Sequence, residues 1–192
     1  MNLPNKLTLS RMVLTFIFIY FISQSGLIAM MIATFVFILA CLTDFFDGYL
    51  ARKNNWISDF GALMDPIADK FLILAAFLAF VRMNIIADWM ALLILGREIL
   101  ITGLRLYALT KGRVLAAEKA GKHKTVSQVV AIFMILSFVI FKEAFTMMSR
   151  WSPVVEAWWR AGIEVLMSIT LVLTLISGIS YLINNRKLIH VQ

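Results

Sequence analysis

The sequence contains very little cysteine and histidine. Cys41 is the single cysteine, and His123 and His190 are the two histidines. One cysteine can form neither an intrachain disulfide nor a cysteine-based metal site. Two histidines also disfavour a histidine-rich zinc site.

Charged residues are scarce as well, at 15% of the chain against about 25% in soluble proteins. Apolar residues make up 61% of the 192 residues, where soluble domains have about 45–50%. A small globule could not bury so many apolar side chains, and the same composition excludes disorder and a fibrous repeat. The length suits one domain, so we expect residues 1–192 to form a single all-α, polytopic membrane domain.

Six apolar stretches predict six transmembrane helices. A span needs about 20 residues, which each stretch reaches with its flanks, and backbone in lipid must satisfy its own hydrogen bonds. The stretches are Met12–Ile22 (extendable to Thr8), Leu27–Thr43, Gly61–Val81, Trp89–Leu109, Val126–Phe141 and Val165–Ile183. Residues 153–160 predict, in addition, a short amphipathic helix at the membrane surface.

Basic residues are unevenly distributed between the two sides that six spans would create. One side has Lys6, Arg11, Arg52, Lys53, Lys111, Arg113, Lys119, Lys122, Lys124, Arg186 and Lys187, and the other has Arg82, Lys142, Arg150 and Arg160. The richer side is expected to be cytoplasmic, with both termini on it. This topology explains the net charge of +7 better than a nucleic-acid partner does.

The tryptophans agree with that orientation. Trp89, Trp151, Trp158 and Trp159 fall on the outer side, where an interfacial aromatic belt is expected. A compact chain without a transit peptide favours the plasma membrane of a bacterium.

Four aspartates lie at helical spacing around the second connection. Asp44 and Asp47 are three residues apart at the end of the second stretch, and Asp65 and Asp69 are four apart at the start of the third. At about 100° per residue, each pair shares one helix face. The alternative is that these aspartates only mark a polar loop at the membrane surface. Charge within a span, however, is costly and usually functional. Four carboxylates can hold two divalent ions, and paired ions clamp phosphates in phosphoryl transfer.

The residues between the two pairs suit the same chemistry. Gly48, Ala51 and Gly61 have little or no side chain, so a ligand can approach the backbone. Arg52 adds positive charge near a bound phosphate.

Residues 44–69 read DFFDGYLARKNNWISDFGALMDPIAD. They resemble, at every fixed position, the signature D-x2-D-G-x2-A-R-x8-G-x3-D-x3-D of the CDP-alcohol phosphatidyltransferase family. The resemblance implies a six-helix homodimer with a cytoplasm-facing polar cavity. It implies that Asp44, Asp47 and Asp65 bind two Mg²⁺ or Mn²⁺ ions, and that Asp69 is the general base and also touches metal. Gly48, Ala51, Arg52 and Gly61 would then contact the CDP-lipid, whose β-phosphorus the acceptor alcohol attacks with release of CMP.

The N-terminal segment PNKLTLSR is similar to the opening of the same family. That similarity places Asn5, Thr8 and Arg11 near the cytidine diphosphate group. The alternative is an interfacial helix start with Arg11 among lipid headgroups.

The acceptor is indicated by residues 96–105, GREILITGLR. They resemble the branch of the family that uses sn-glycerol 3-phosphate. Arg97, Glu98 and Arg105 are costly within a span and should face the cavity. The forked guanidinium suits a phosphate, and Glu98 is expected to orient one arginine.

Residues 118–125, EKAGKHKT, resemble another element of the family. Lys119, Lys122 and Lys124 are candidates to close over the acceptor phosphate. The alternative is a positive-inside loop that binds anionic lipid headgroups.

The expected reaction is therefore phosphatidyl transfer from CDP-diacylglycerol to glycerol 3-phosphate, giving phosphatidylglycerophosphate and CMP. The same chemistry with inositol phosphate or phosphatidylglycerol as acceptor is the nearest alternative. A divalent-cation transporter is the alternative from another class, but its carboxylates would line a path across the membrane, whereas these aspartates gather on one side.

Overall fold

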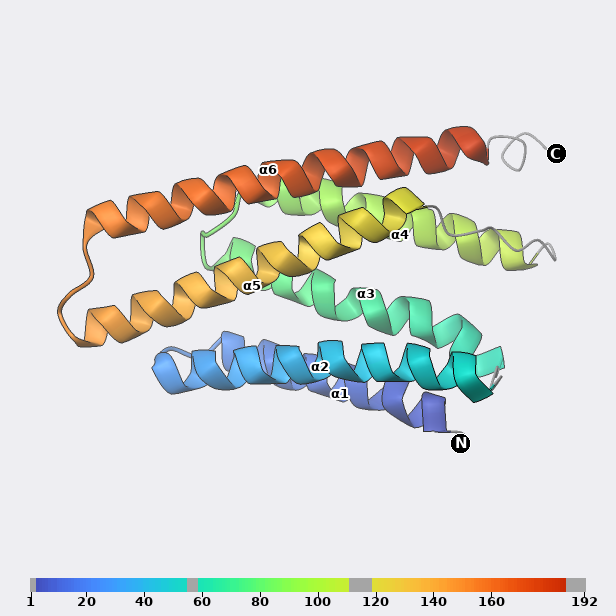
Figure 1. Ribbon diagram of the computed structural model, residues 1–192, viewed down its shortest axis with the longest axis horizontal. Helices are drawn as coiled ribbons and strands as arrows, with labels where there is room; N and C mark the ends of the chain where they lie inside the picture. Colours follow the sequence, from blue (N-terminus) through green and yellow to red (C-terminus); the bar gives the residue numbers. More distant parts are fainter. Residues whose placement is uncertain (1–2, 55–58, 111–118, 186–192) are drawn as a thin grey trace.

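Six α-helices make up the part of the chain that the computed structural model describes, namely residues 3–54, 59–110 and 119–185 (Figure 1). They are α1 (Leu3–Ile22), α2 (Leu27–Asn54), α3 (Asp59–Arg82), α4 (Asp88–Thr110), α5 (Lys119–Met147) and α6 (Pro153–Asn184). Within these ranges, the side chains of residues 3–8, 44–54, 59–67, 69, 109, 119 and 120 are outside the description. The described residues include no strand, so the all-α prediction is confirmed.

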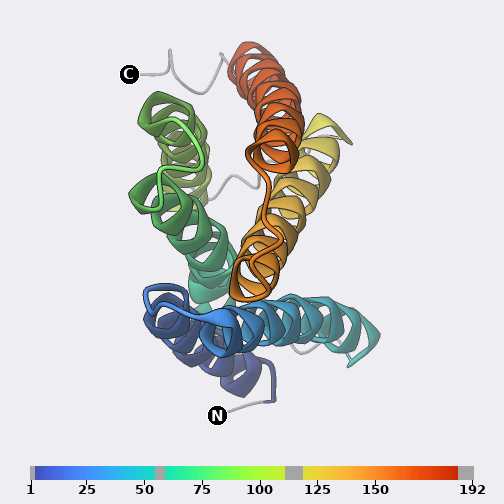
Figure 2. The same ribbon diagram turned by 90° about the vertical axis from the view of Figure 1, so that its left-hand side faces the viewer.

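Each of the six apolar stretches lies within one helix, in the predicted order. Figure 1 shows the start of α1 and the end of α6 at the same end of the molecule. The short connections 23–26, 83–87 and 148–152 lie at the opposite end, which faces the viewer in Figure 2. The helices thus alternate in direction.

The predicted short helix over residues 153–160 is not a separate element. These residues are helical, but they form the first turns of α6, which continues unbroken to Asn184. Ser152 caps the helix by accepting a hydrogen bond from the backbone N–H of Val154, and Pro153 occupies the first turn, where its missing N–H costs nothing. No proline follows within α6 to end the first turns, so the helix runs on into the predicted sixth span.

The helices have the surface of a membrane protein. Gly121–Met147 and Pro153–Asn184 are both long and apolar enough to cross a bilayer, and Leu9–Ile22 and Leu27–Thr43 are shorter apolar helices, in a search limited to the described residues. Large apolar side chains face outward along the bundle, such as Ile28 (75% exposed) and Leu92 (71%). So much apolar surface would be unfavourable in water, which supports a membrane protein.

Aromatic side chains join α1, α2 and α5 in the core. The ring of Phe37 on α2 lies 5.6 Å from that of Phe18 on α1 and 5.5 Å from that of Phe133 on α5, measured between centroids. α4 contacts α3 and α6 instead. Aromatic contacts thus join α1, α2 and α5, whereas α4 packs between α3 and α6.

Candidate active site

A cavity of about 710 Å³ lies among the helices, lined by residues from all six of them. Its volume is in the range of small-molecule sites, about 300–1,000 Å³. Six of the described lining residues are basic: Arg11, Lys70, Arg97, Arg105, Lys122 and Lys124. Glu98 is the acidic residue among the described lining side chains. The cavity is thus suited to an anion.

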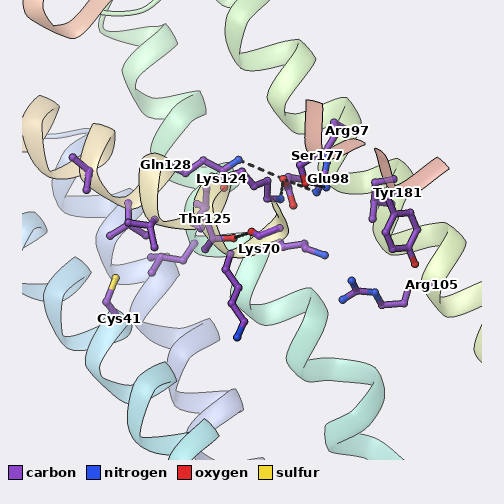
Figure 3. A pocket seen from close by; sticks show the side chains of 18 of the residues that line it. Cys41, Lys70, Arg97, Glu98, Arg105, Lys124, Thr125, Gln128, Ser177 and Tyr181 are labelled. Carbon is purple, nitrogen blue, oxygen red and sulfur yellow. Dashed lines mark hydrogen bonds and ion pairs between the residues drawn. The ribbon is translucent and has the colours of Figure 1, made fainter. Parts of the chain in front are cut away.

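Glu98 connects α4 to α5 on one side of the cavity (Figure 3). Its side chain is buried, and its carboxylate is paired with the ammonium group of Lys124. Arg97 Nη1 lies 3.3 Å from Glu98 Oε1, and Gln128 Nε2 lies 3.4 Å from the same oxygen. A buried carboxylate requires such partners. The contact with Arg97 agrees with the predicted orienting role of Glu98, whereas its pairing with Lys124 was not predicted.

A second set of contacts connects α3 to α4. Lys70 donates a hydrogen bond to the hydroxyl of Thr102, and Thr102 in turn donates to the backbone oxygen of Glu98 at 2.7 Å. Lys70 directly follows Asp69 in the sequence. The cavity therefore borders the segment of α3 that contains the end of the aspartate motif.

The two arginines of α4 contact α6. Arg97 Nη2 donates to Ser177 Oγ at 2.8 Å. The guanidinium carbon of Arg105 lies 5.7 Å from the centroid of the Tyr181 ring, within the range of a cation–π contact. Both predicted arginines thus reach the cavity wall, as the cost of charge within a span led us to expect.

Ser177 and Tyr181 were missed by the sequence reasoning, although the sequence contains a signal for them. Thr170, Thr174, Ser177 and Tyr181 recur at steps of four, three and four residues, and all four are buried. This is the period of one helix face. A polar face in an uncharged and mostly apolar stretch could have marked α6 as part of the site.

The predicted lysines differ in their surroundings. Lys122 lines the cavity and is exposed, and Lys124 lines it while buried against Glu98. The side chain of Lys119 falls outside the described part of the chain.

The other predicted site residues also have side chains outside the described part, although their backbone is helical. In α1 these are Asn5 and Thr8, in α2 Asp44, Asp47, Gly48, Ala51 and Arg52, and in α3 Gly61, Asp65 and Asp69. Residues 55–58 alone separate α2 from α3, and Figure 1 shows both motif-bearing ends at the same end of the molecule. Among the described side chains, no group of three His, Cys, Asp or Glu could hold a metal ion; the predicted ligands are not among them.

Comparisons with known proteins agree with the motif. A model of the CDP-alcohol phosphatidyltransferase family matches residues 1–180. A Bacillus subtilis protein named CDP-diacylglycerol–glycerol-3-phosphate 3-phosphatidyltransferase is 39% identical over 147 residues, which cover 70% of this chain and 76% of the relative. A Rickettsia felis protein of the same name is 41% identical over 137 residues (70% and 75%). A Mycobacterium tuberculosis protein named "Probable phosphatidylglycerophosphate synthase" is 42% identical over 134 residues (68% and 64%).

Proposed function

The chain belongs to the CDP-alcohol phosphatidyltransferase family, and we propose that it transfers the phosphatidyl group of CDP-diacylglycerol to sn-glycerol 3-phosphate. The products are phosphatidylglycerophosphate and CMP. The names of the relatives support these substrates. The structural observation that carries the proposal is the cavity wall with six basic side chains and Glu98, because a dianionic acceptor needs several cations.

Arg105 is the principal acceptor-phosphate ligand in this proposal. Among the described side chains it has no carboxylate partner, and its Nε makes no hydrogen bond there. Arg97 and Lys124 share Glu98 and supply further charge. Lys119 and Lys122, in the first turn of α5, are the remaining candidates. Arginine also matches the planar oxygen pairs of a phosphate better than lysine does.

The metal site is proposed from the donor set. Asp44, Asp47, Asp65 and Asp69 offer hard carboxylate oxygens, which Mg²⁺ and Mn²⁺ prefer. Both pairs lie in helical backbone at spacings of three and four, so each pair of positions shares one face. Two ions bound there would neutralise negative charge on the pyrophosphate.

The protein's own residues perform the remaining steps. Asn5, Thr8, Gly48, Ala51, Arg52 and Gly61 hold the CDP-lipid. Asp69 accepts the proton of the glycerol 3-phosphate hydroxyl while that oxygen bonds to the β-phosphorus. The bond from the β-phosphorus to the bridging oxygen breaks, and CMP leaves. Positioning of the two substrates beside each other contributes the rest of the rate enhancement.

The proposed setting is a bacterial plasma membrane, crossed six times, with both termini and the active site cytoplasmic and with two copies forming a homodimer. Two observations support the orientation, namely the alternating helices and the excess of Lys and Arg on one side. The relatives from bacteria support the bacterial setting. Membrane lipids would surround the outward-facing apolar side chains.

CMP release by the purified protein tests the function. The protein in detergent receives CDP-diacylglycerol, Mg²⁺ or Mn²⁺, and one acceptor at a time: glycerol 3-phosphate, inositol phosphate or phosphatidylglycerol. We expect CMP with glycerol 3-phosphate and with neither of the others. Equal release with inositol phosphate would overturn the acceptor. No release with any acceptor, together with Mn²⁺ uptake into vesicles containing the protein, would favour a transporter.

A further inference from the structure

The polar face of α6 meets the cavity at its C-terminal half. Thr170 and Thr174 direct their hydroxyls to backbone oxygens of Ser127 and Thr170, at 3.4 and 2.7 Å. Ser177 and Tyr181 instead contact the arginines of α4, and both are 2% exposed. The two halves of one polar face thus have different partners, and the second half faces the charged part of the cavity.

Arg97 fits closely against α6 because residue 178 is glycine. A Cβ atom at this position would lie 3.0 Å from Cγ of Arg97 and 3.4 Å from its Nε. The aliphatic part of Arg97 therefore occupies the space that a side chain at position 178 would take. Its guanidinium is held at one end by Ser177 and at the other by Glu98.

Arg105 is supported differently, by the ring of Tyr181. The guanidinium lies over this ring at 5.7 Å, and the pair lines the cavity together. Within the described part of the chain, Arg105 Nε makes no hydrogen bond although it is buried. A buried polar atom without a partner calls for an explanation, and a ligand in the cavity supplies one.

We propose that Ser177, Gly178 and Tyr181 form a seat on α6 that positions Arg97 and Arg105 for the phosphate of the acceptor. The three residues are positioning residues, and they lie outside the aspartate motif. An arginine side chain loses much conformational freedom when it binds, so a side chain already held in place binds phosphate more tightly. This inference rests on the proposed function and adds the element that organises its acceptor site.

Substitutions of Tyr181 test the ring contact. Tyr181→Phe keeps the ring, and we expect the KM for glycerol 3-phosphate to stay within about threefold of the parent value. Tyr181→Leu removes the ring, and we expect that KM to rise about tenfold, with little change in the KM for CDP-diacylglycerol. An unchanged acceptor KM in Tyr181→Leu, or equal rises in both variants, would overturn the ring contact.

Gly178→Ala tests the seat without removing any interacting group. Alanine favours helix more than glycine does, so a loss of helix stability is not expected, whereas the new Cβ displaces Arg97. We expect the KM for glycerol 3-phosphate to rise about three- to tenfold, while the KM for CDP-diacylglycerol stays constant. Ile179→Ala is the matched control, because Ile179 is the next residue and 58% exposed.

Failure of the proposed function and failure of the proposed seat give different results. If the parent releases no CMP with glycerol 3-phosphate, the proposed acceptor is wrong. If the parent is active and Gly178→Ala behaves like Ile179→Ala, the seat is wrong while the function stands. Should Tyr181→Leu fold poorly, the KM of Gly178→Ala alone decides: a rise specific to glycerol 3-phosphate supports the seat, and parental values overturn it.

Discussion

Charge pairing between individual side chains determines which cations in the cavity are available to a ligand. Glu98 contacts Lys124, Arg97 and Gln128, so one negative charge is shared by two positive ones. Arg105 has an aromatic ring beside it instead of a carboxylate. A phosphate that reaches Lys124 must therefore share it with Glu98, whereas Arg105 has no competing anion among the described side chains.

The pair of Glu98 and Lys124 should be visible in a double-mutant cycle. Glu98→Gln leaves the buried ammonium of Lys124 without its carboxylate, and breaking a buried pair costs about 3–5 kcal/mol. We expect Glu98→Gln and Lys124→Met each to lower the thermal unfolding temperature in detergent. The double variant should lose clearly less than the sum, with a coupling energy above about 1 kcal/mol. Strictly additive losses would show that the two side chains do not depend on each other.

Asp69 has a distinct expected signature. Asp69→Asn keeps the size of the side chain but cannot accept the proton of the acceptor hydroxyl, so turnover should be abolished. Binding of CDP-diacylglycerol, followed by titration calorimetry, should largely survive. Asp88→Asn is a suitable control because Asp88 is exposed at the start of α4, at the opposite end of the bundle. Normal CMP release by Asp69→Asn would refute its assignment as the base.

At the scale of helices, most of the fold could be predicted from the sequence. Apolar runs of near-membrane length placed all six helices, because lipid leaves the backbone few alternatives to a helix. The beginning of α6 was the exception. The amphipathic character of residues 153–160 led us to predict a separate helix there, whereas α6 continues because nothing in the chain interrupts it.

Sequence reasoning could name candidate site residues only where they lie close together in short motifs. The aspartate motif occupies 26 residues, so its spacing alone identifies it. The contact of Ser177 with Arg97 joins residues 80 positions apart, and it depends on how α4 and α6 pack. The periodicity of α6 indicates a polar face, but it does not tell which helix that face contacts.

Glu156 connects three elements at the end of the bundle opposite the motif. Its carboxylate accepts hydrogen bonds from Lys142 of α5 (2.9 Å), Trp151 (3.0 Å) and Arg160 (2.9 Å). Arg160 also donates to the backbone oxygen of Asn84, in the connection from α3 to α4. This group of contacts thus links the connections at one end of the molecule.

Glu156→Gln should weaken that end without affecting the reaction. The contacts are partly exposed, so we expect a loss of stability of about 1 kcal/mol, measured as a lower unfolding temperature in detergent. KM values should stay at parental levels because the cavity is lined by other residues. Glu164→Gln, on an exposed position of the same helix, is the control and should unfold like the parent. A change in acceptor KM would mean that this end communicates with the site.

At the scale of the whole molecule, the alternating helices separate two chemically different ends. The end that contains the start of α1 also contains the aspartate motif and the start of α5 (Figure 1). Trp89, Trp151, Trp158 and Trp159 belong to the start of α4, the last connection and the first turns of α6, all at the other end. Tryptophan prefers the membrane interface and basic residues prefer the cytoplasmic side, so the charge asymmetry and the fold support the same orientation.

This orientation predicts opposite labelling of two introduced cysteines. Gln24 is exposed in the connection from α1 to α2, and Thr110 is exposed at the end of α4, at the other end of the bundle. In intact cells, a membrane-impermeant maleimide should label Gln24→Cys, whereas Thr110→Cys should react only after the membrane is opened. The parent chain, with Cys41 as its single cysteine, gives the background to subtract. Labelling of Thr110→Cys in intact cells would place the aspartate motif outside, where the cytoplasmic substrates proposed for it could not reach.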